Sequence, residues 1–384
     1  MMFSYSDLVE YVKFHSFVSG KESPTPTLKW NVYGTDLGIP CYLDKEKTLC
    51  LFFGDTFSTP LPSDQDWRGT VIGKVKNLDF SKGIIFDSFV SDEKGSAKNI
   101  IIHHKCKNEE NYEVTKICQG GVEANGVLYA FFQSIRTWGA PGYWDVNYSA
   151  AIKSTDGGNT WERCFPLTWV GKIDKYASLI KELVKEDINM NITNNEIDIE
   201  SHHSEAFSQI YPYKRDGYVY IFGRRGGRQY GVSLGKVKEQ DIETFEEYEY
   251  LVNIGGERKW IKGIEGLKEL NKHEMESYII PLPVSNVTIT FNKFLKKYIA
   301  LYYKPNYGVV FRTAQEIIGP YIDEQLLIKQ DDEHLPMTPY GLYGGFTHDL
   351  MTNENGQIFY FIVSQWNKIA YLSELFECKL KGDK

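Results

Sequence analysis

The sequence predicts an all-β protein, specifically a five-bladed β-propeller with short helical insertions. Three observations predict this fold. Aromatic residues, which favour strands, make up 15% of the 384 residues. Strand-like runs recur in pairs joined by short turns, and five such hairpins begin near residues 34, 118, 205, 284 and 344. Segments with helical periodicity are few. A β-unit of about four strands that recurs along the chain is typical of a propeller blade.

Turn residues mark the hairpins. The dipeptides Asn125-Gly126 and Asp216-Gly217 are those most typical of a two-residue turn between antiparallel strands. A two-sheet sandwich is the alternative architecture, but 384 residues are many for that fold. The predicted hairpins span residues 33–57, 117–135, 204–223, 285–303 and 343–366.

Three segments are predicted to be helical. Residues Asp7 to Phe14 place apolar side chains at helical spacing, and Asp7 with Glu10 has the spacing of a capping box. Residues 173–188 and 263–271 show similar periodicity. We assign the first helix to an N-terminal lead-in, residues 1–28, and residues 29–384 to a single propeller domain.

Residues 154–161, with the sequence STDGGNTW, have the form of an Asp box, a turn seen in sialidases and other propellers. Its Asp and Gly residues suit a tight turn between two outer strands, and its Trp suits packing beneath that turn. The pattern indicates architecture and carries almost no functional information, because such turns lie on the blade rim.

Composition and charge disfavour several classes of function. The formal net charge is −8 without a block of Lys or Arg, so neither nucleic acid nor an anionic membrane is an expected partner. No apolar run approaches the ~20 residues needed to cross a bilayer. The 6 cysteines form no C-x-x-C pair, which argues against a zinc module. We therefore expect a soluble monomer with no metal and no cofactor.

The N-terminal residues, Met1 to Phe17, lack the basic segment, the apolar core and the cleavage site of a signal peptide. The chain as given is therefore predicted to be cytoplasmic, and a secreted protein is the alternative if the natural chain begins earlier. In line with a reducing compartment, Cys41 and Cys50 are predicted to be reduced, buried thiols that face each other in the first hairpin.

The first hairpin also places two aspartates together. If residues 44–47 (DKEK) form its loop, Leu43 pairs with Thr48, and the same register sets Asp36 opposite Asp55. Sheets normally avoid like charges at facing positions, and two such carboxylates share a proton, which raises one apparent pKa. Acid–base chemistry uses such pairs. The alternative is that each aspartate caps a turn beside a glycine.

Several segments together resemble a known family, the bacterial domain-of-unknown-function family 4185 (DUF4185), which consists of five-bladed propellers. The resemblance extends from about residue 30 to the C-terminus. Some members are glycoside hydrolases that cleave D-arabinan internally, which is the activity that the resemblance implies. It also implies an acidic residue at the start of the fourth inner strand, where this chain has Asn286. The segments are GTDLG (34–38), FGDTF (53–57), STDGGNTW (154–161), FRTA with GPY (within 311–321) and SQW (364–366).

We therefore predict a glycoside hydrolase-like protein that cleaves a furanoside, arabinan-like glycan in an axial pit. Of Asp36 and Asp55, one serves as base or nucleophile and the other as its orienting partner. Glycoside cleavage also needs a proton donor, for which Glu123, Asp145 and Glu205 are the candidates near the ends of inner strands. The separation of the carboxyl groups differs between retaining and inverting enzymes, and both outcomes stay open.

Other polar and aromatic residues near these strand ends are predicted to bind the glycan by stacking or by hydrogen bonds to hydroxyls. For each of them alone, a structural role is the alternative. A non-catalytic carbohydrate-binding propeller is the alternative function, and a protein-interaction propeller is the third. The predicted substrate-binding residues are Trp144, His203, Glu205, Arg224, Asn286, His348 and Trp366.

Overall fold

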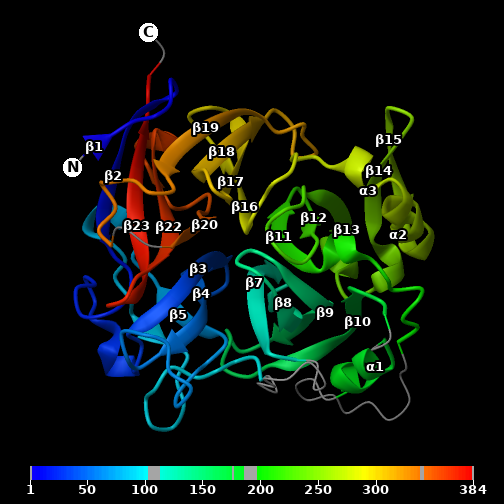
Figure 1. Ribbon diagram of the computed structural model, residues 1–384, viewed down its shortest axis with the longest axis horizontal. Coiled ribbons are helices and arrows are strands. Elements are labelled where there is room, and N and C mark those ends of the chain that lie inside the picture. Colours follow the sequence, from blue (N-terminus) through cyan, green and yellow to red (C-terminus); the bar gives the residue numbers. More distant parts are fainter. Residues whose placement is uncertain (1, 103–112, 175–176, 186–196, 338–340, 383–384) are drawn as a thin grey trace. The chain divides into compact units, whose positions relative to one another are not determined.

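The five sheets of the protein are those of a five-bladed β-propeller, which confirms the predicted fold (Figure 1). Internal contacts divide the chain into two compact units. Unit 1 comprises Met1–Tyr42, Lys47–Asn99 and Val284–Lys384, and unit 2 comprises Leu43–Glu46 and Ile100–Pro283. The computed structural model describes residues 2–102, 113–174, 177–185, 197–337 and 341–382.

Unit 1 contains three blades. Their strands pair in the orders β3–β4–β5–β6, β16–β17–β18–β19 and β1–β2–β23–β22–β20, and β21 also pairs with β22. The strands of the first blade are β3 Gly34–Leu43, β4 Thr48–Phe57, β5 Val71–Val75 and β6 Ser88–Phe89. Those of the second are β16 Val287–Asn292, β17 Lys297–Lys304, β18 Gly308–Ala314 and β19 Ile322–Lys329. Those of the third are β1 Met2–Phe3, β2 Val9–Phe17, β20 Leu342–Phe346, β21 Thr352–Asn353, β22 Ile358–Trp366 and β23 Tyr371–Leu380.

Unit 2 contains two blades, with strand orders β10–β9–β8–β7 and β11–β12–β13–β14–β15. The strands of the first are β7 Thr115–Ala124, β8 Val127–Trp138, β9 Trp144–Ser154 and β10 Glu162–Val170. Those of the second are β11 Gln209–Arg215, β12 Tyr218–Arg224, β13 Ser233–Lys238, β14 Glu249–Ile254 and β15 Glu257–Lys262.

The helices are short. The α-helices α1 Ala177–Lys185 and α2 Gly263–Lys272 confirm the helices predicted over 173–188 and 263–271, although 175–176 and 186–188 lie outside the described residues. A four-residue helix, α3 Glu274–Ser277, follows α2. The single-turn 3-10 helices are η1 Thr27–Trp30, η2 Phe80–Lys82, η3 Glu205–Phe207, η4 Glu239–Asp241, η5 Phe245–Glu247 and η6 Glu354–Gly356.

The predicted N-terminal helix is wrong, because residues Val9–Phe17 form the strand β2, which pairs antiparallel with β23. The blade formed by the C-terminal strands thus gains an N-terminal strand, and the lead-in is not separate from the propeller sheets. The physical reason is non-local. The backbone groups at the outer edge of β23 need partners, and a segment rich in β-branched and aromatic residues supplies them.

The tight turns form as the dipeptides predict. Ala124 pairs with Val127 and Arg215 with Tyr218, so Asn125-Gly126 and Asp216-Gly217 each close a hairpin. All four turn residues have positive φ, from 51° to 78°, as the turn that matches strand twist requires.

The turn at 154–161 joins β9 to β10, the two outermost strands of their blade. The Asp156 carboxylate accepts hydrogen bonds from the backbone of Asn159 and Thr160 and from the Thr160 hydroxyl, at 3.0, 2.9 and 2.7 Å. These hydrogen bonds lower the pKa of Asp156 to about 2 although partial burial opposes the shift. The Trp161 indole is buried and donates to the Gly158 carbonyl. The carboxylate therefore stabilises the turn itself.

Each unit has its own apolar core. In unit 1 the core includes Phe361 and Phe376, whose rings stack 5.7 Å apart between β22 and β23. In unit 2 it is centred on Trp169 of β10, packed among aromatic residues of the neighbouring blade. Cys41 and Cys50 of the first hairpin are buried thiols, as predicted.

Two glutamates of β23 are expected to affect stability with opposite dependence on pH. Burial raises the pKa of Glu374 well above its ordinary value, and the Gln365 amide lies 3.0 and 2.9 Å from its oxygens. Burial also opposes ionisation of Glu377, but hydrogen bonds from Lys13 and Tyr11 lower its pKa. A raised carboxyl pKa costs stability once the pH exceeds its unfolded value, whereas a lowered pKa adds stability there.

Glu374→Gln is therefore expected to raise the melting temperature at pH 8 and to leave it nearly unchanged near pH ~4, where glutamate protonates in the unfolded chain. Glu377→Gln, the matched control on the same strand, should lower the melting temperature at pH 8, and its effect should shrink as the pH falls. Thermal melts of both variants across this range test the pair. Equal effects at all pH values would contradict it.

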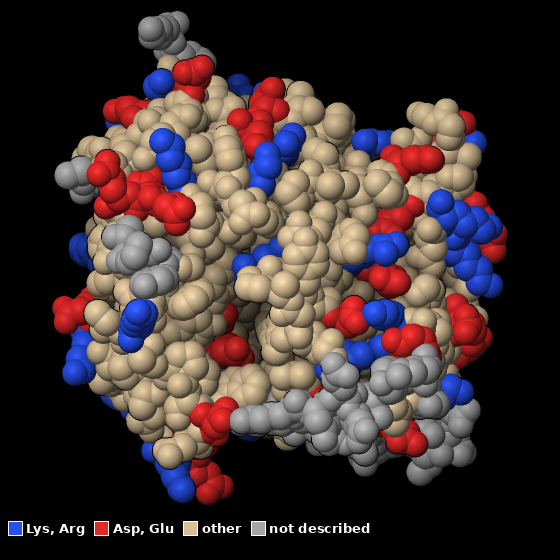
Figure 2. All heavy atoms as spheres, in the orientation of Figure 1, with Lys and Arg blue, Asp and Glu red and all other residues tan. Residues whose placement is uncertain are grey.

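None of the helices in the described part of the chain is long and apolar enough to cross a membrane. On the face drawn in Figure 2, the positive and negative side chains are interspersed.

Candidate functional site

The strands β3 and β4 of unit 1 carry Asp36 and Asp55 in the neighbourhood that the register predicts. The hydroxyls of Thr35 and Thr56, the residues next to the aspartates, lie 2.7 Å apart in the interior. Thr35 and Thr56 therefore oppose each other on one face of the hairpin. Because side chains alternate along a strand, Asp36 and Asp55, the next pair, lie on the other face. Asp36 is buried, with 8% of its surface exposed, and Asp55 is half-buried.

The backbone after Asp36 is bent in a way that sets the position of its carboxylate. Leu37 and Gly38 have φ of 62° and 98°, in the left-handed region. The Leu37 amide donates to the Ser364 hydroxyl of β22 at 2.8 Å. A side chain at Gly54, the neighbour of Asp55, would meet the Asp36 Oδ1 atom at 2.3 Å. The Asp36 carboxylate therefore occupies the space above a glycine.

Each aspartate accepts a hydrogen bond from an aromatic side chain. The Tyr343 hydroxyl donates to Asp36 Oδ2 at 2.7 Å and lies 2.7 Å from the Tyr371 hydroxyl. The Trp67 indole donates to Asp55 Oδ1 at 2.6 Å. We call these five residues the aspartate pair and its aromatic donors. Donors aimed at a carboxylate favour its charged form, and both carboxylates are oriented by rigid rings.

The surroundings of this cluster change the pKa of Tyr371. Burial, followed by the charges of Asp36, Tyr343 and Asp55, raises the pKa of Tyr371 well above its ordinary value. A neutral Tyr371 phenol can donate its proton in a hydrogen bond to Asp36, next to the bond from Tyr343. This arrangement can support a charged base or nucleophile next to a second carboxylate.

Of the other predicted residues in unit 1, Trp366 lies beside this cluster. It pairs with Tyr371 across β22 and β23, is 48% exposed, and its indole lies over Gly341, where an added side chain would clash. Asn286 precedes the first strand of its blade, and its side chain accepts from Ser285 at 3.3 Å.

His348 is not brought together with Asp36, and its assignment as a substrate-binding residue stays a prediction. Its ring lies 6.4 Å from that of Tyr42, six residues further along β3 than Asp36. Because a strand advances about 3.3 Å per residue, this is roughly 20 Å along the strand. The Nδ1 atom of His348 accepts from the Leu350 amide, so it stabilises a turn.

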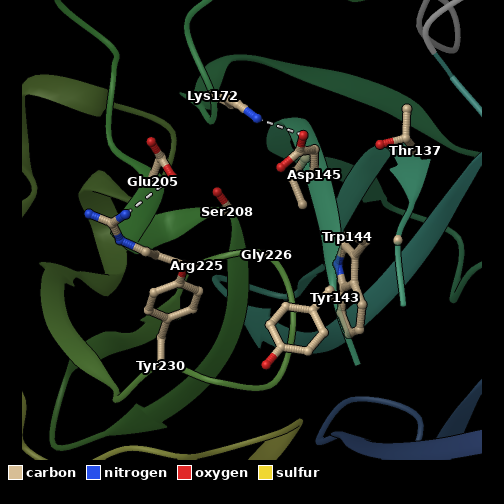
Figure 3. A pocket seen from close by; sticks show the side chains of 12 residues that line it. Thr137, Tyr143, Trp144, Asp145, Lys172, Glu205, Ser208, Arg225, Gly226 and Tyr230 are labelled. Carbon is tan, nitrogen blue, oxygen red and sulfur yellow. Dashed lines mark hydrogen bonds and ion pairs between the residues drawn. The ribbon is translucent and has the colours of Figure 1, made fainter. Parts of the chain in front are cut away.

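In unit 2, a pocket of about 200 Å³ brings together other predicted residues. The blade formed by β7–β10 contributes Tyr143, Trp144, Asp145 and Lys172, and the blade formed by β11–β15 contributes Glu205, Ser208, Arg225 and Tyr230. Figure 3 shows Glu205 and Arg225 on one side of the space and Asp145, Trp144 and Tyr143 on the other. Among the described residues, no group of three or more His, Cys, Asp or Glu side chains is placed to hold a metal ion.

Two ion pairs lie in this pocket. Lys172 Nζ contacts Asp145 Oδ2 at 2.8 Å, and this hydrogen bond raises the pKa of Lys172. Arg225 lies 3.4 Å from Glu205 and makes closer contacts, 2.8 to 3.0 Å, with Glu274. The bond to Glu274 raises the pKa of Arg225 above its ordinary value. The cations of the pocket are thus held by carboxylates.

Glu123 does not line this pocket, so the structure does not bring together all three candidate proton donors, Glu123, Asp145 and Glu205. Glu123 pairs with Leu128, which pairs with Ser154, whereas Asp145 pairs with Thr137. The two carboxylates therefore lie at opposite ends of one sheet. Glu123 accepts a hydrogen bond from the Asp44 amide and so holds the turn at 43–46.

Arg224 and His203 also lie outside the pocket. The Arg224 side chain is 3% exposed and donates to Gln209 Oε1 at 2.8 Å. Burial, followed by the charge of Arg228, lowers the pKa of Arg224 to about 9. Its neighbour Arg225 lines the pocket instead, because successive residues of an extended chain point to opposite faces. The backbone of His203 forms an isolated parallel β-bridge with Val170, and the Nε2 atom of the His203 ring is buried.

Trp67, Tyr343 and Tyr371 were not predicted from the sequence. A signal existed for Tyr343, because it occupies the start of the fifth hairpin, as Asp36 occupies the start of the first. Trp67 follows β4 by ten residues, and an isolated pairing of Thr56 with Arg68 brings it back to Asp55. No local pattern predicts that return.

The arrangement of the sheets defines the class of this protein, which is a five-bladed β-propeller. A family model described as "Domain of unknown function (DUF4185)" matches residues 22–377. The chain belongs to this family, which confirms the resemblance found in the sequence.

Two similar proteins provide further comparison. The "Notoamide biosynthesis cluster protein J'" of Aspergillus versicolor is 27% identical over 362 residues, which cover 89% of this chain and 83% of that protein. A crystal structure from Bacteroides ovatus, described as a "putative hydrolase", has a TM-score of 0.59 at 12% identity and covers 98% of this chain and 93% of its own. At 12% identity, this similarity shows only that the two proteins share a fold.

Proposed function

We propose that the protein is a glycoside hydrolase that cleaves a furanoside, arabinan-like glycan with Asp36 and Asp55. The observation that carries the proposal is the aspartate pair itself. Two acidic residues at neighbouring positions of one hairpin are each held by a buried or half-buried aromatic donor, at 2.7 and 2.6 Å. Such an arrangement costs stability, because like charges are kept close together, and it is typical of sites that perform acid–base chemistry.

In the proposed mechanism, one aspartate acts as base or nucleophile and the other orients it and modulates its charge. Tyr343 fixes the rotamer of Asp36 through Oδ2, and Trp67 does the same for Asp55 through Oδ1. The exposed indole of Trp366, opposite Tyr371, offers a flat face on which a sugar ring can stack.

Among the candidate proton donors, Asp145 and Glu205 are tested first because they line one pocket. A glycoside with a good leaving group, such as a nitrophenyl furanoside, needs little protonation of the departing oxygen. Loss of the acid should therefore reduce polysaccharide cleavage far more than cleavage of this activated substrate. Comparing Asp145→Asn and Glu205→Gln on both substrates identifies the donor.

The proposal is tested by incubating the wild-type protein with D-arabinan, L-arabinan or xylan and measuring the new reducing ends that cleavage of each glycan produces. We expect release from an arabinan and little from xylan, whose sugars are pyranosides. If no glycan is cleaved but one binds, the non-catalytic carbohydrate-binding propeller replaces the enzyme.

A further inference from the structure

We propose that the pocket of unit 2 binds one neutral sugar ring and so forms a glycan subsite with its own ligand contacts. This inference rests on the proposed function, which takes its candidate proton donors Asp145 and Glu205 from the same pocket. The pocket has a volume of about 200 Å³, which gives room for a sugar ring.

The charges of the pocket favour a neutral ligand that donates hydrogen bonds. Asp145 is paired with Lys172, and Arg225 is shared between Glu205 and Glu274. An anionic ligand would have to displace a carboxylate from its cation, and a cationic ligand would have to displace the cation. Hydroxyl groups need neither change, because a carboxylate has several lone pairs and an ammonium or guanidinium has several N–H donors.

The aromatic residues supply the apolar contact that a sugar ring needs. Tyr143 and Tyr230 are 53% and 37% exposed, although both rings line the pocket. The indole of Trp144 lies beside Tyr143 (Figure 3). Trp138 packs edge-on against Trp144, with ring centroids 5.6 Å apart. Large exposed rings next to hydrogen-bonding groups form a surface that suits the apolar face and polar rim of a sugar.

The walls of the pocket are formed before any ligand binds. The Arg228 amide donates to the Gly142 carbonyl at 2.9 Å, which ties the loop after β12 to the turn before β9. A side chain at Gly226 would approach the Trp144 carbonyl to 2.6 Å, so this close passage of two backbones requires glycine. Binding to such a pocket has a small ordering cost, which favours recognition of a small ligand.

The proposal is tested with the Asp36→Asn protein, in which hydrolysis is removed while unit 2 is unchanged. Saturation-transfer NMR with arabinose and xylose, and with arabinan oligosaccharides, measures binding. The double substitution Tyr143→Ala with Tyr230→Ala should weaken affinity about tenfold, because two stacking contacts are lost. The control is Tyr307→Ala, which removes a tyrosine that is 45% exposed in unit 1 and should leave affinity unchanged.

Ionic strength separates the ligand classes. Binding of a neutral sugar should be insensitive to salt, whereas binding of an amino acid or another charged ligand should weaken as salt screens its charges. Binding of charged ligands in place of sugars would overturn the inference. When the double substitution is made in the otherwise wild-type protein, hydrolysis that persists with unchanged KM would also overturn it. Sugar binding without hydrolysis in the wild type would contradict the proposed function and leave the subsite in place.

Discussion

Replacing Asp36 or Asp55 by asparagine is expected to reduce glycan hydrolysis by about 10²- to 10⁴-fold, the usual contribution of a general acid or base. Asparagine keeps the shape and can still accept the bond from Tyr343 or Trp67, but it cannot take up a proton or attack as a carboxylate. Folding should be preserved or slightly improved, because the substitution removes the repulsion between neighbouring carboxylates. Initial rates on arabinan and melting curves of both variants measure the two effects.

The matched control is Asp349→Asn in the same unit. Asp349 accepts from the Thr290 hydroxyl at 2.6 Å and the Phe291 amide at 3.0 Å, which is the pattern of a structural carboxylate. This variant should change stability and leave the rate intact. If Asp36→Asn and Asp55→Asn instead melt early at wild-type specific activity, both aspartates are turn caps and the catalytic proposal falls.

The largest effect on stability is expected for Trp169→Ala, which should cost about 3–5 kcal/mol. The Trp169 side chain is completely buried, its indole donates to the Tyr250 hydroxyl at 2.9 Å, and it packs against Phe245 and Tyr248 at ring distances of 5.3 and 5.4 Å. Whole domains are stable by only about 5–15 kcal/mol, so one substitution should remove a large part of the stability of unit 2. Denaturant titration followed by circular dichroism measures the loss.

Two variants separate the causes of this loss. Trp138→Ala removes an indole that is 49% exposed and should cost no more than about 1 kcal/mol. Tyr250→Phe removes only the acceptor of the indole N–H and should cost about 1–3 kcal/mol, the penalty for a buried donor without a partner. Equal losses for Trp169→Ala and Trp138→Ala would show that burial does not govern the effect.

Much of the fold could be predicted because its signals are local. The dipeptides at 125–126 and 216–217 set their turns through positive φ, and the loop at 44–47 set a register that agrees with the contact between Thr35 and Thr56. The failure at Val9–Phe17 has the opposite cause. Its partner, β23, lies at the other end of the chain, and pairing to that edge outweighed a weak helical pattern.

The candidate site could be predicted only in part. Asp36 and Asp55 belong to one hairpin, so the sequence brought them together, and Asp145 and Glu205 do line one pocket. Glu123 was predicted from its place near an inner-strand end, Arg224 from its guanidinium donors and His348 from its place in the fifth inner strand. Register separates Glu123 from Asp145, side-chain direction turns Arg224 away from the pocket, and distance along β3 separates His348 from Asp36.

The sequence by itself determined that this protein is a five-bladed propeller with two aspartates on its first hairpin, because turns, alternation and register act over a few residues. Only the tertiary structure decided what surrounds them. Tyr343 donates a hydrogen bond to Asp36, a residue 307 positions away in the chain. The backbone at Gly226 passes close to the Trp144 carbonyl of the neighbouring blade, beside the pocket. Such contacts depend on packing between elements distant in the chain, which no local pattern encodes.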